Sequence, residues 1–273
     1  MQASHHWSPP RGTLGTIVEE AYERARLLAR DHSARLANAL PSAPESPSLA
    51  QALRSSTVGV LAEVKRRSPS KGTIAGGLNA VDQASAYQAG GAAAVSILTE
   101  PSHFGGSVED LEAVRNRVSL PILKKDFHVE VIQLVEARSL GASAALLIAR
   151  ALSPDRLIAL VDEGRALGLE LLVEVRDEYE LETAIQAKAT MIGVNNRNLE
   201  TLVIDPPTCD RLIPKIPSDI VAVAESGVQS RADVERYAAI GADAVLVGSV
   251  LSASADPREA TRELAGVPRR ARG

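Results

Sequence analysis

Residues 144–194 read AALLIARALSPDRLIALVDEGRALGLELLVEVRDEYELETAIQAKATMIGV and alternate short apolar runs with longer amphipathic segments. The apolar runs cover residues 144–148, 170–175 and 191–194. The amphipathic segments between them cover residues 153–167 and 178–187. Short runs of Val, Ile and Leu without polar alternation are typical of strands buried on both faces. Ser153-Pro154 has the form of a helix start, and Gly168 that of a helix stop. The stretch therefore predicts parallel strands joined by helices.

The same alternation continues on both sides of this stretch. The apolar runs cover residues 58–64, 93–98, 121–123, 144–148, 170–175, 191–194, 220–224 and 244–247, and further helix-like segments cover residues 129–140 and 231–240. Eight such units favour a closed barrel over an open doubly wound sheet. Because no run is followed by a Gly-x-Gly-x-x-Gly turn, a dinucleotide-binding fold is disfavoured. We therefore predict an α/β protein with a (β/α)8 TIM barrel.

A separate helical segment precedes the barrel pattern. Apolar residues recur at spacings of three and four in residues 13–40, and the proline-rich residues 41–47 must end that helix. Residues 49–53 then predict a short second helix. We expect residues 1–56 to form an N-terminal helical extension packed across one mouth of the barrel, and residues 57–273 to form the barrel itself.

Composition narrows the class of protein. The chain has 273 residues, of which 45% are hydrophobic and 3% aromatic, with a formal net charge of −4. Such a chain can fill a large core, but it has no general attraction for nucleic acid and few aromatic platforms for stacking bases. The single cysteine, Cys209, excludes a disulfide framework and is expected to be an incidental thiol.

The sequence also bears on location and partners. No apolar run approaches the roughly 18 residues that a membrane span needs, and the N-terminus does not resemble a secretory signal. We therefore expect a cytoplasmic protein with neither a membrane nor a nucleic-acid partner. The sequence leaves the oligomeric state open, with a monomer as the simplest expectation.

Polar and charged side chains follow the predicted strands at their C-terminal ends, where barrels of this kind place their active sites. Charged groups at buried strand ends are costly unless they pair with each other or with a ligand. In chain order, the residues at these ends are Glu63, Lys65, Lys125, Glu174, Asn195, Arg197, Glu225, Ser226, Gly227, Gly248 and Ser249. Because the strand ends share one rim, we predict that they form one active site.

Structural interpretations of these residues remain open. Glu63 and Lys65 share one side of a strand and could form an ion pair without a catalytic role. Glu174, alone in an apolar strand, is either paired structurally or catalytic. Glu225 could serve only to orient a lysine, and Arg197 could bind backbone carbonyls. The basic neighbours expected at the solvated surface are Lys124, Arg66 and Arg67.

The residue types at the strand ends indicate acid–base chemistry on a phosphorylated small molecule. Two lysines and up to three carboxylates around a dry mouth form proton-transfer pairs, each shifting the pKa of the others. We find neither a Ser-His-Asp set nor clustered metal ligands in the sequence, so we expect acid–base or lysine chemistry without a metal. Gly227 and Gly248-Ser249 offer backbone N–H groups for a phosphate, with residues 252–256 as the short extra helix. His5 and His6 are expected at a frayed terminus rather than at a metal.

Several motifs at these strand ends resemble those of indole-3-glycerol phosphate synthase. They are EVKRRSPS at 63–70, KDF at 125–127, LVEV at 172–175, IGVNNRNL at 192–199 and AESG at 224–227, with PSLA at 47–50 and SILTE at 96–100. The resemblance covers residues 47–253. One such motif alone would be weak, but their order along the chain makes the match specific.

The resemblance implies a carboxy-lyase of tryptophan biosynthesis. Members of the family convert 1-(2-carboxyphenylamino)-1-deoxyribulose 5-phosphate to indole-3-glycerol phosphate, releasing carbon dioxide and water. They need no cofactor, because the aniline nitrogen of the substrate supplies the electrons. Two features of this chain depart from the family pattern, an arginine-rich first helix and His128 in place of an aliphatic residue.

The resemblance also implies roles for the site residues. Lys125 is the general acid that protonates the substrate's ketone, and Glu174 is a base or stabilises developing positive charge. Lys65 binds the anthranilate carboxylate and serves in the dehydration step. Glu63 and Glu225 orient the lysines, and either can be the base that restores the aromatic ring. The remaining residues are Asn195 and Arg197 at hydroxyl and carboxylate groups, Ser68, Ser226, Gly227, Gly248 and Ser249 at the phosphate, and Phe127, Leu147 and Phe104 at the anthranilate ring.

Three alternatives remain at this point. Another sugar-phosphate barrel, such as phosphoribosylanthranilate isomerase, would want a cysteine base where Glu63-Val64-Lys65 stands. A Schiff-base aldolase could use Lys125 or Lys65. A catalytically silent barrel could serve as a scaffold. We also predict that the loop of residues 66–76 is mobile and becomes ordered over the substrate.

Overall fold

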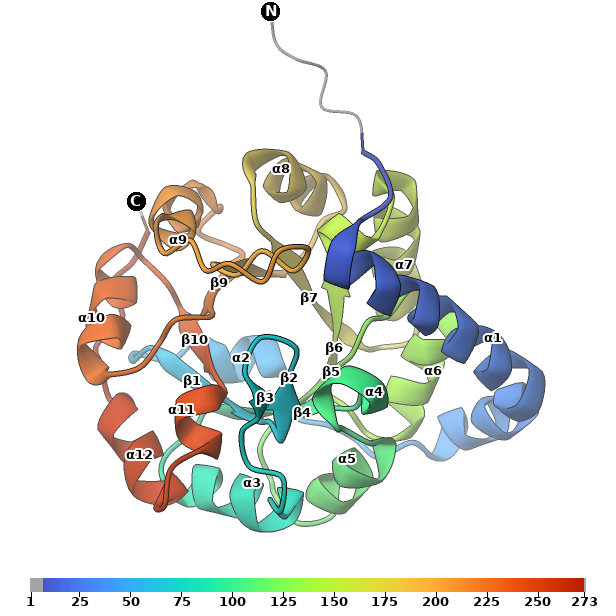
Figure 1. The fold of residues 1–273 in the computed structure, drawn as a ribbon, viewed down its shortest axis with the longest axis horizontal. Coiled ribbons are helices and arrows are strands. Elements are labelled where there is room, and N and C mark those ends of the chain that lie inside the picture. Colours follow the sequence, from blue (N-terminus) through green and yellow to red (C-terminus); the bar gives the residue numbers. More distant parts are fainter. Residues whose placement is uncertain (1–6, 273) are drawn as a thin grey trace, which may run out of the picture.

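The computed structural model describes residues 7–272, so His5 and His6 lie outside the described residues. Within this range a closed parallel barrel has the strand order β1-β10-β9-β8-β7-β6-β5-β4, which confirms the predicted (β/α)8 fold (Figure 1). Its strands are β1 (Gly59–Val64), β4 (Ala94–Leu98), β5 (Ile122–Lys125), β6 (Ala144–Ile148), β7 (Glu170–Val175), β8 (Met191–Asn195), β9 (Val221–Glu225) and β10 (Ala244–Val247). A two-stranded hairpin of β2 (Arg67–Ser68) and β3 (Gly72–Thr73) follows β1.

The first strand closes the barrel by pairing with both its neighbours. Gly59 of β1 lies opposite Ala244 of β10, and Leu61 lies opposite Ala94 of β4. Almost every strand residue is buried, because side chains alternate between the barrel interior and the layer beneath the helices. The unbroken apolar runs that predict the strands are a consequence of this double burial.

A ring of helices surrounds the strands (Figure 1). They are α3 (Ala80–Ala89), α4 (Pro101–Phe104), α5 (Val108–Arg115), α6 (Val131–Ser139), α7 (Pro154–Ala166), α8 (Glu178–Gln186), α9 (Pro207–Leu212), α10 (Arg231–Ala239), α11 (Ser249–Ser252) and α12 (Pro257–Leu264), with 3-10 turns at Leu40–Ser42, Ala149–Ala151 and Ile213–Lys215. Ser153 caps α7 by accepting a hydrogen bond from Arg156 N, as the Ser-Pro start predicts. In the described part of the chain, no helix is both long and apolar enough to cross a membrane.

The N-terminal extension reaches both ends of the barrel. Helix α1 (Gly12–Ala39) packs along α6, and its first turns line the cavity at the C-terminal ends of the strands. Helix α2 (Leu49–Leu53) packs at the opposite end, where Glu170 at the start of β7 accepts hydrogen bonds from Ser48 Oγ and from the backbone of Leu49. Helix α1 therefore lies at the mouth that carries the cavity, and α2 lies at the other end of the barrel.

Candidate active site

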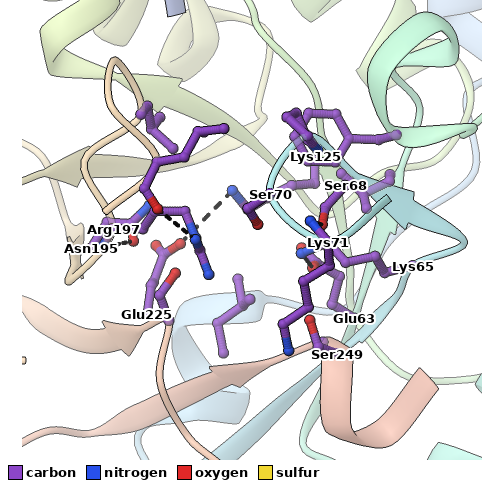
Figure 2. A pocket seen from close by; sticks show the side chains of 18 of the residues that line it. Glu63, Lys65, Ser68, Ser70, Lys71, Lys125, Asn195, Arg197, Glu225 and Ser249 are labelled. Atoms are coloured by element: carbon purple, nitrogen blue, oxygen red, sulfur yellow. Dashed lines mark hydrogen bonds and ion pairs between the residues drawn. The ribbon is translucent and has the colours of Figure 1, made fainter. Parts of the chain in front are cut away.

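A cavity of about 530 Å³ opens at the C-terminal ends of the barrel strands. It is lined by all but one of the residues predicted for the site: Glu63, Lys65, Ser68, Phe104, Lys125, Phe127, Glu174, Asn195, Arg197, Glu225, Ser226, Gly227, Gly248 and Ser249. In Figure 2, Asn195, Arg197 and Glu225 lie on one side of this cavity, and Glu63, Lys65 and Ser249 lie on the other. Strands far apart in the sequence thus contribute to one site.

Leu147 is the predicted residue that the structure does not place at the cavity. Its neighbours Leu146 and Ile148 line the cavity instead, while Leu147 is fully buried elsewhere. Successive side chains of a strand point to opposite faces, so Leu147 belongs to the face of β6 that packs beneath the helices. The apolar wall from this strand is therefore formed by Leu146 and Ile148.

Lys125 lies at the centre of a buried ionic cluster. Its Nζ is 3.3 Å from Glu174 Oε2 and 3.8 Å from Glu225 Oε2. Asn195 Nδ2 donates a hydrogen bond of 2.9 Å to the other oxygen of Glu174, and Asn195 Oδ1 accepts one from Arg197 N. Since these side chains come from β5, β7, β8 and β9, the barrel itself sets the distance between the lysine and the carboxylates.

Burial and neighbouring charge shift the pKa values of this cluster in opposite senses. Although burial alone would lower the pKa of Lys125, Glu174 and Glu225 raise it above its ordinary value. Burial raises the pKa of Glu225 well above the usual range, and the nearby Glu174 raises it further. Lys125 is therefore held as an ammonium, and the Glu225 carboxyl favours its protonated form.

Two glycines make room for the buried carboxylates. A Cβ at residue 193 in β8 would lie 1.9 Å from Glu225 Oε1, and one at residue 248 would lie 2.5 Å from Glu63 Oε1. Glu63 in turn binds Lys65, with 2.5 Å between Oε1 and Nζ. Gly248, predicted at the phosphate, thus has the further role of admitting Glu63. Nothing in the apolar run of residues 191–194 indicates this role of Gly193.

The end of the cavity near β10 has the features expected of a phosphate site. Ser226 and Gly227 both adopt positive φ values, of 63° and 102°, and turn the chain sharply after β9. Ser249 begins α11, so the short helix covers residues 249–252 and not the predicted residues 252–256. Lys71, on the turn of the β2–β3 hairpin, also lines the cavity, as Ser249 does (Figure 2).

Another part of the cavity wall is apolar. The rings of Phe104 and Phe127 lie 6.1 Å apart between centroids, and Lys65 Nζ lies 6.0 Å from the Phe104 centroid. Leu14 and Ile17 of α1 also line the cavity. A flat aromatic ring with an attached carboxylate suits this combination of an apolar wall and a lysine.

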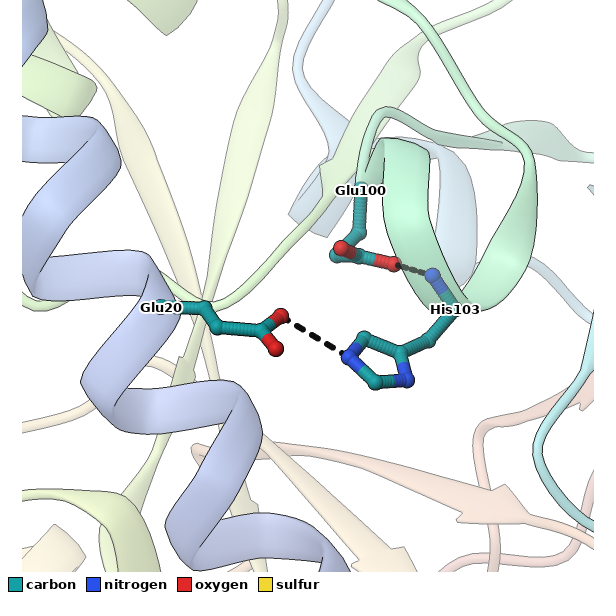
Figure 3. A group of neighbouring side chains, drawn as sticks. All are labelled: Glu20, Glu100 and His103. Carbon is teal, nitrogen blue, oxygen red and sulfur yellow. Dashed lines mark hydrogen bonds and ion pairs between the residues drawn. The ribbon is translucent and has the colours of Figure 1, made fainter.

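Ion pairs attach α1 to the rim of the cavity. Arg24 donates a hydrogen bond of 2.8 Å to Asp126, the residue after Lys125, and lies 3.4 Å from Glu100. Glu20 of the same helix lies 2.8 Å from His103 Nε2 (Figure 3). The N-terminal extension therefore contacts the residue next to Lys125 at the end of β5.

Glu20, Glu100 and His103 place possible metal-ligand atoms within 4.8 Å of one another. However, Glu100 accepts hydrogen bonds from the backbone N–H groups of Ser102, His103 and Phe104, and Arg24 lies against it as well. These donors occupy the oxygens that a metal would need, and the arginine would repel a cation. The group is better described as an ionic contact between α1 and α4.

Two of the expected surface residues are partly or fully buried. Lys124 is only 1% exposed and lies under α6, with its Nζ 3.0 Å from Glu136 Oε2. Arg66 forms an ion pair with Asp110 and donates a hydrogen bond to Leu78 O. Both expectations were wrong, because partners distant in the sequence satisfy the two cations. Arg67 is exposed, as expected.

The comparison with known proteins identifies the family. The sequence profile of the family described as indole-3-glycerol phosphate synthase matches residues 15–264. The chain belongs to the indole-3-glycerol phosphate synthase family. This membership supports the synthase prediction over the isomerase and the silent scaffold.

Individual relatives agree with this assignment. The indole-3-glycerol phosphate synthase of Rhodococcus opacus is 50% identical over 226 residues, which cover 83% of this chain and 84% of the relative. The enzyme of Streptomyces griseus is 47% identical, and the match covers 92% of this chain and 91% of the relative. The enzyme of Mycobacterium bovis is 45% identical, and the match covers 93% of this chain and 94% of the relative.

Solved structures of other proteins share the fold. A 3-hexulose-6-phosphate synthase from Salmonella typhimurium has a TM-score of 0.60 at 16% identity, covering 76% of this chain and 96% of that one. A mutant tryptophan synthase alpha-subunit from Pyrococcus furiosus has a TM-score of 0.59 at 16% identity, covering 78% and 99%. At 16% identity, the likeness of these two structures to this chain shows a shared fold and nothing more.

Proposed function

We propose that this protein closes the indole ring of indole-3-glycerol phosphate with Lys125 as the general acid. The observation that carries the proposal is the buried contact of Lys125 Nζ with Glu174 and Glu225, in a cavity that is lined both by phenylalanines and by the glycines and serines that follow β9 and β10. The enzyme is then a carboxy-lyase of tryptophan biosynthesis, which we place in the cytoplasm with its phosphorylated substrate. It needs no cofactor, because the aniline nitrogen supplies the electrons.

Ring closure is the step that requires the acid. The ring carbon that bears the carboxylate attacks the ketone carbon of the sugar, and Lys125 donates its proton to the ketone oxygen as the carbon–carbon bond forms. Positive charge then develops on the aniline nitrogen, and the Glu174 carboxylate stabilises it. Loss of carbon dioxide returns the electron pair to the ring and neutralises this charge.

Dehydration restores the aromatic indole. Lys65 donates a proton to the new hydroxyl, which leaves as water, and a carboxylate accepts a proton from the adjacent carbon. Because Glu225 favours its protonated form, we assign this base to Glu63, which lies 2.5 Å from Lys65. Two protons are donated and one is accepted, so one proton is taken up when the substrate carboxylate leaves as neutral carbon dioxide.

Substrate binding follows from the distribution of charge around the cavity. The substrate carries a carboxylate and a phosphate, whereas the chain as a whole is acidic. We assign the carboxylate to Lys65 and Arg197, the sugar hydroxyls to Asn195, and the phosphate to Ser68, Lys71, Gly227, Gly248 and Ser249. The anthranilate ring then lies against Phe104 and Phe127, with Leu146 in place of Leu147.

An assay of indole formation tests the proposed function. Purified protein is mixed with 1-(2-carboxyphenylamino)-1-deoxyribulose 5-phosphate, and indole fluorescence is followed. We expect indole-3-glycerol phosphate to accumulate in step with release of carbon dioxide. Phosphoribosylanthranilate serves as the control substrate for an isomerase. Turnover of that compound without indole from the first would reject the proposal.

A further inference from the structure

The distance between Lys125 and Glu174 depends on a strand that carries neither residue. Lys125 lies in β5 and Glu174 in β7, with β6 between them. Strands β6 and β7 stay paired up to Ile148 and Glu174, so that side of β6 is held throughout. On the other side, the paired residues of β5 and β6 are Leu123 with Ala144 and Lys124 with Ala145. The ladder thus ends one residue before Lys125.

His128 bridges β5 and β6 at the point where this pairing ends. Its Nδ1 lies 2.7 Å from the carbonyl oxygen of Leu146, which follows the last paired residue of β6. Its Nε2 lies 3.4 Å from Lys124 Nζ. Since a lysine ammonium only donates, Nε2 accepts and the ring proton resides on Nδ1, which donates to Leu146 O.

The histidine stays neutral in this position. It is 2% exposed, and burial together with Lys124 lowers its pKa to about 3. The Nδ1–H donor is therefore present at every pH at which the enzyme would work. Lys124 does not need the histidine as a partner, because its Nζ forms an ion pair with Glu136 at 3.0 Å. The hydrogen bond to Leu146 O is therefore the contact of His128 that matters for the structure.

We propose that His128 is a positioning residue, whose bond to Leu146 O extends the seam between β5 and β6 and fixes the separation of Lys125 and Glu174. Leu146 also lines the cavity, so the same bond sets the apolar wall beside the substrate ring. The inference rests on the proposed roles of Lys125 and Glu174.

Substitution of His128 by Asn or by Gln tests its two contacts one at a time. The amide nitrogen of His128→Asn lies near the position of Nδ1 and can donate to Leu146 O. The amide of His128→Gln lies near Nε2 and retains only the contact with Lys124. We expect kcat of the Asn variant within about threefold of the parent and kcat of the Gln variant about tenfold lower, with KM changed less, since small misplacements of catalytic groups act on the chemical step.

A double-mutant cycle distinguishes positioning from general loss of structure. If His128 acts through Lys125, His128→Gln should change kcat less than twofold in the Lys125→Ala background. Assays are run at 10 °C and scaled to the folded fraction, and His128→Leu replaces the Gln variant if that does not fold. Equal kcat for the Asn and Gln variants, or the same tenfold loss in both backgrounds, would overturn the inference. An inactive parent enzyme would instead reject the proposed function.

Discussion

Glu225 shows at the scale of one residue how the fold creates an unusual acid. Its carboxyl is buried between Lys125 and Glu174, and Gly193 leaves the space that it occupies. The motif at residues 224–227 indicated that Glu225 belongs to the site, but not which protonation state it favours. That state depends on the exclusion of water and on two strands that the sequence does not place at a known distance.

Glu225→Gln should remove a pH-dependent loss of stability. The pKa of Glu225 is raised in the folded protein, whereas in the unfolded chain it is about 4.3. As the pH rises, the unfolded chain therefore loses this proton at a lower pH than the folded protein does. The contribution of the Glu225 carboxyl to stability is fully present below about pH 4.3 and is lost as the pH rises through the folded pKa. The Gln variant has no such proton.

Urea unfolding between pH 4.5 and 8.5 measures this difference. We expect the parent to lose stability relative to Glu225→Gln as the pH rises, by about 1.4 kcal/mol for each unit by which the pKa is raised. Exposed Glu182→Gln is the control for loss of one carboxyl. Parallel curves for the parent and Glu225→Gln would show that Glu225 has an ordinary pKa in the fold.

Gly193→Ala should displace the same carboxyl. The added Cβ would meet Glu225 Oε1 at 1.9 Å, so the carboxyl or the strand must move. We expect a loss of about 1–3 kcal/mol of stability and a lower kcat, as for other overpacked cores. Gly77→Ala is the matched control, because its Cβ would meet no atom within 4 Å. Unchanged kcat in Gly193→Ala would indicate that Glu225 has room to adapt.

At the scale of elements, the strands and most helices follow from the sequence, whereas the face of each strand does not. Strand β6 is apolar throughout, so no polar alternation shows which residues point inward, and Leu147 was assigned to the wrong face. For the same reason Lys124 was expected at the surface, although it lies buried under α6. Lys71 was missed because only the fold of the β2–β3 hairpin brings it to the cavity.

The contact of α1 with the rim gives a prediction at this scale. Arg24→Ala removes the cation beside Asp126 and Glu100, both of which are buried. Because Arg24 is partly exposed, we expect a loss of only about 1–2 kcal/mol of stability, together with a higher KM as α1 loosens over the cavity. Arg26→Ala on the exposed side of the helix is the control. Equal KM values for the two variants would contradict a role for α1 in closing the site.

At the scale of the whole molecule, the two ends of the barrel have different tasks. The cavity and its charged residues lie at the C-terminal ends of the strands, whereas the other end is held by contacts such as those of Asp243. Asp243 accepts a hydrogen bond from Ala222 N and forms ion pairs with Arg269 and Arg272 of the C-terminal segment. Residues in such positions of a barrel serve stability rather than chemistry.

Asp243→Asn should therefore weaken the fold without changing the reaction. Breaking a buried ion pair with Arg272 is expected to cost about 3 kcal/mol. Cys209 reports the loss, because its thiol is fully buried and burial raises its pKa to about 12, so thiol reagents reach it only on unfolding. We expect faster labelling of Cys209 and kcat within twofold of the parent. A large fall in kcat with unchanged labelling would contradict this division.

The most direct test of the account is kcat for Lys125→Ala with the carboxyphenylamino-deoxyribulose phosphate, measured by indole fluorescence beside exposed Lys215→Ala. A positioned general acid contributes roughly 100- to 10,000-fold to rate, so we predict a loss of kcat in that range for Lys125→Ala and none for Lys215→Ala. Binding of a non-reactive substrate analogue should change far less. A folded Lys125→Ala enzyme with kcat within threefold of the parent would contradict the assignment of Lys125 as the acid.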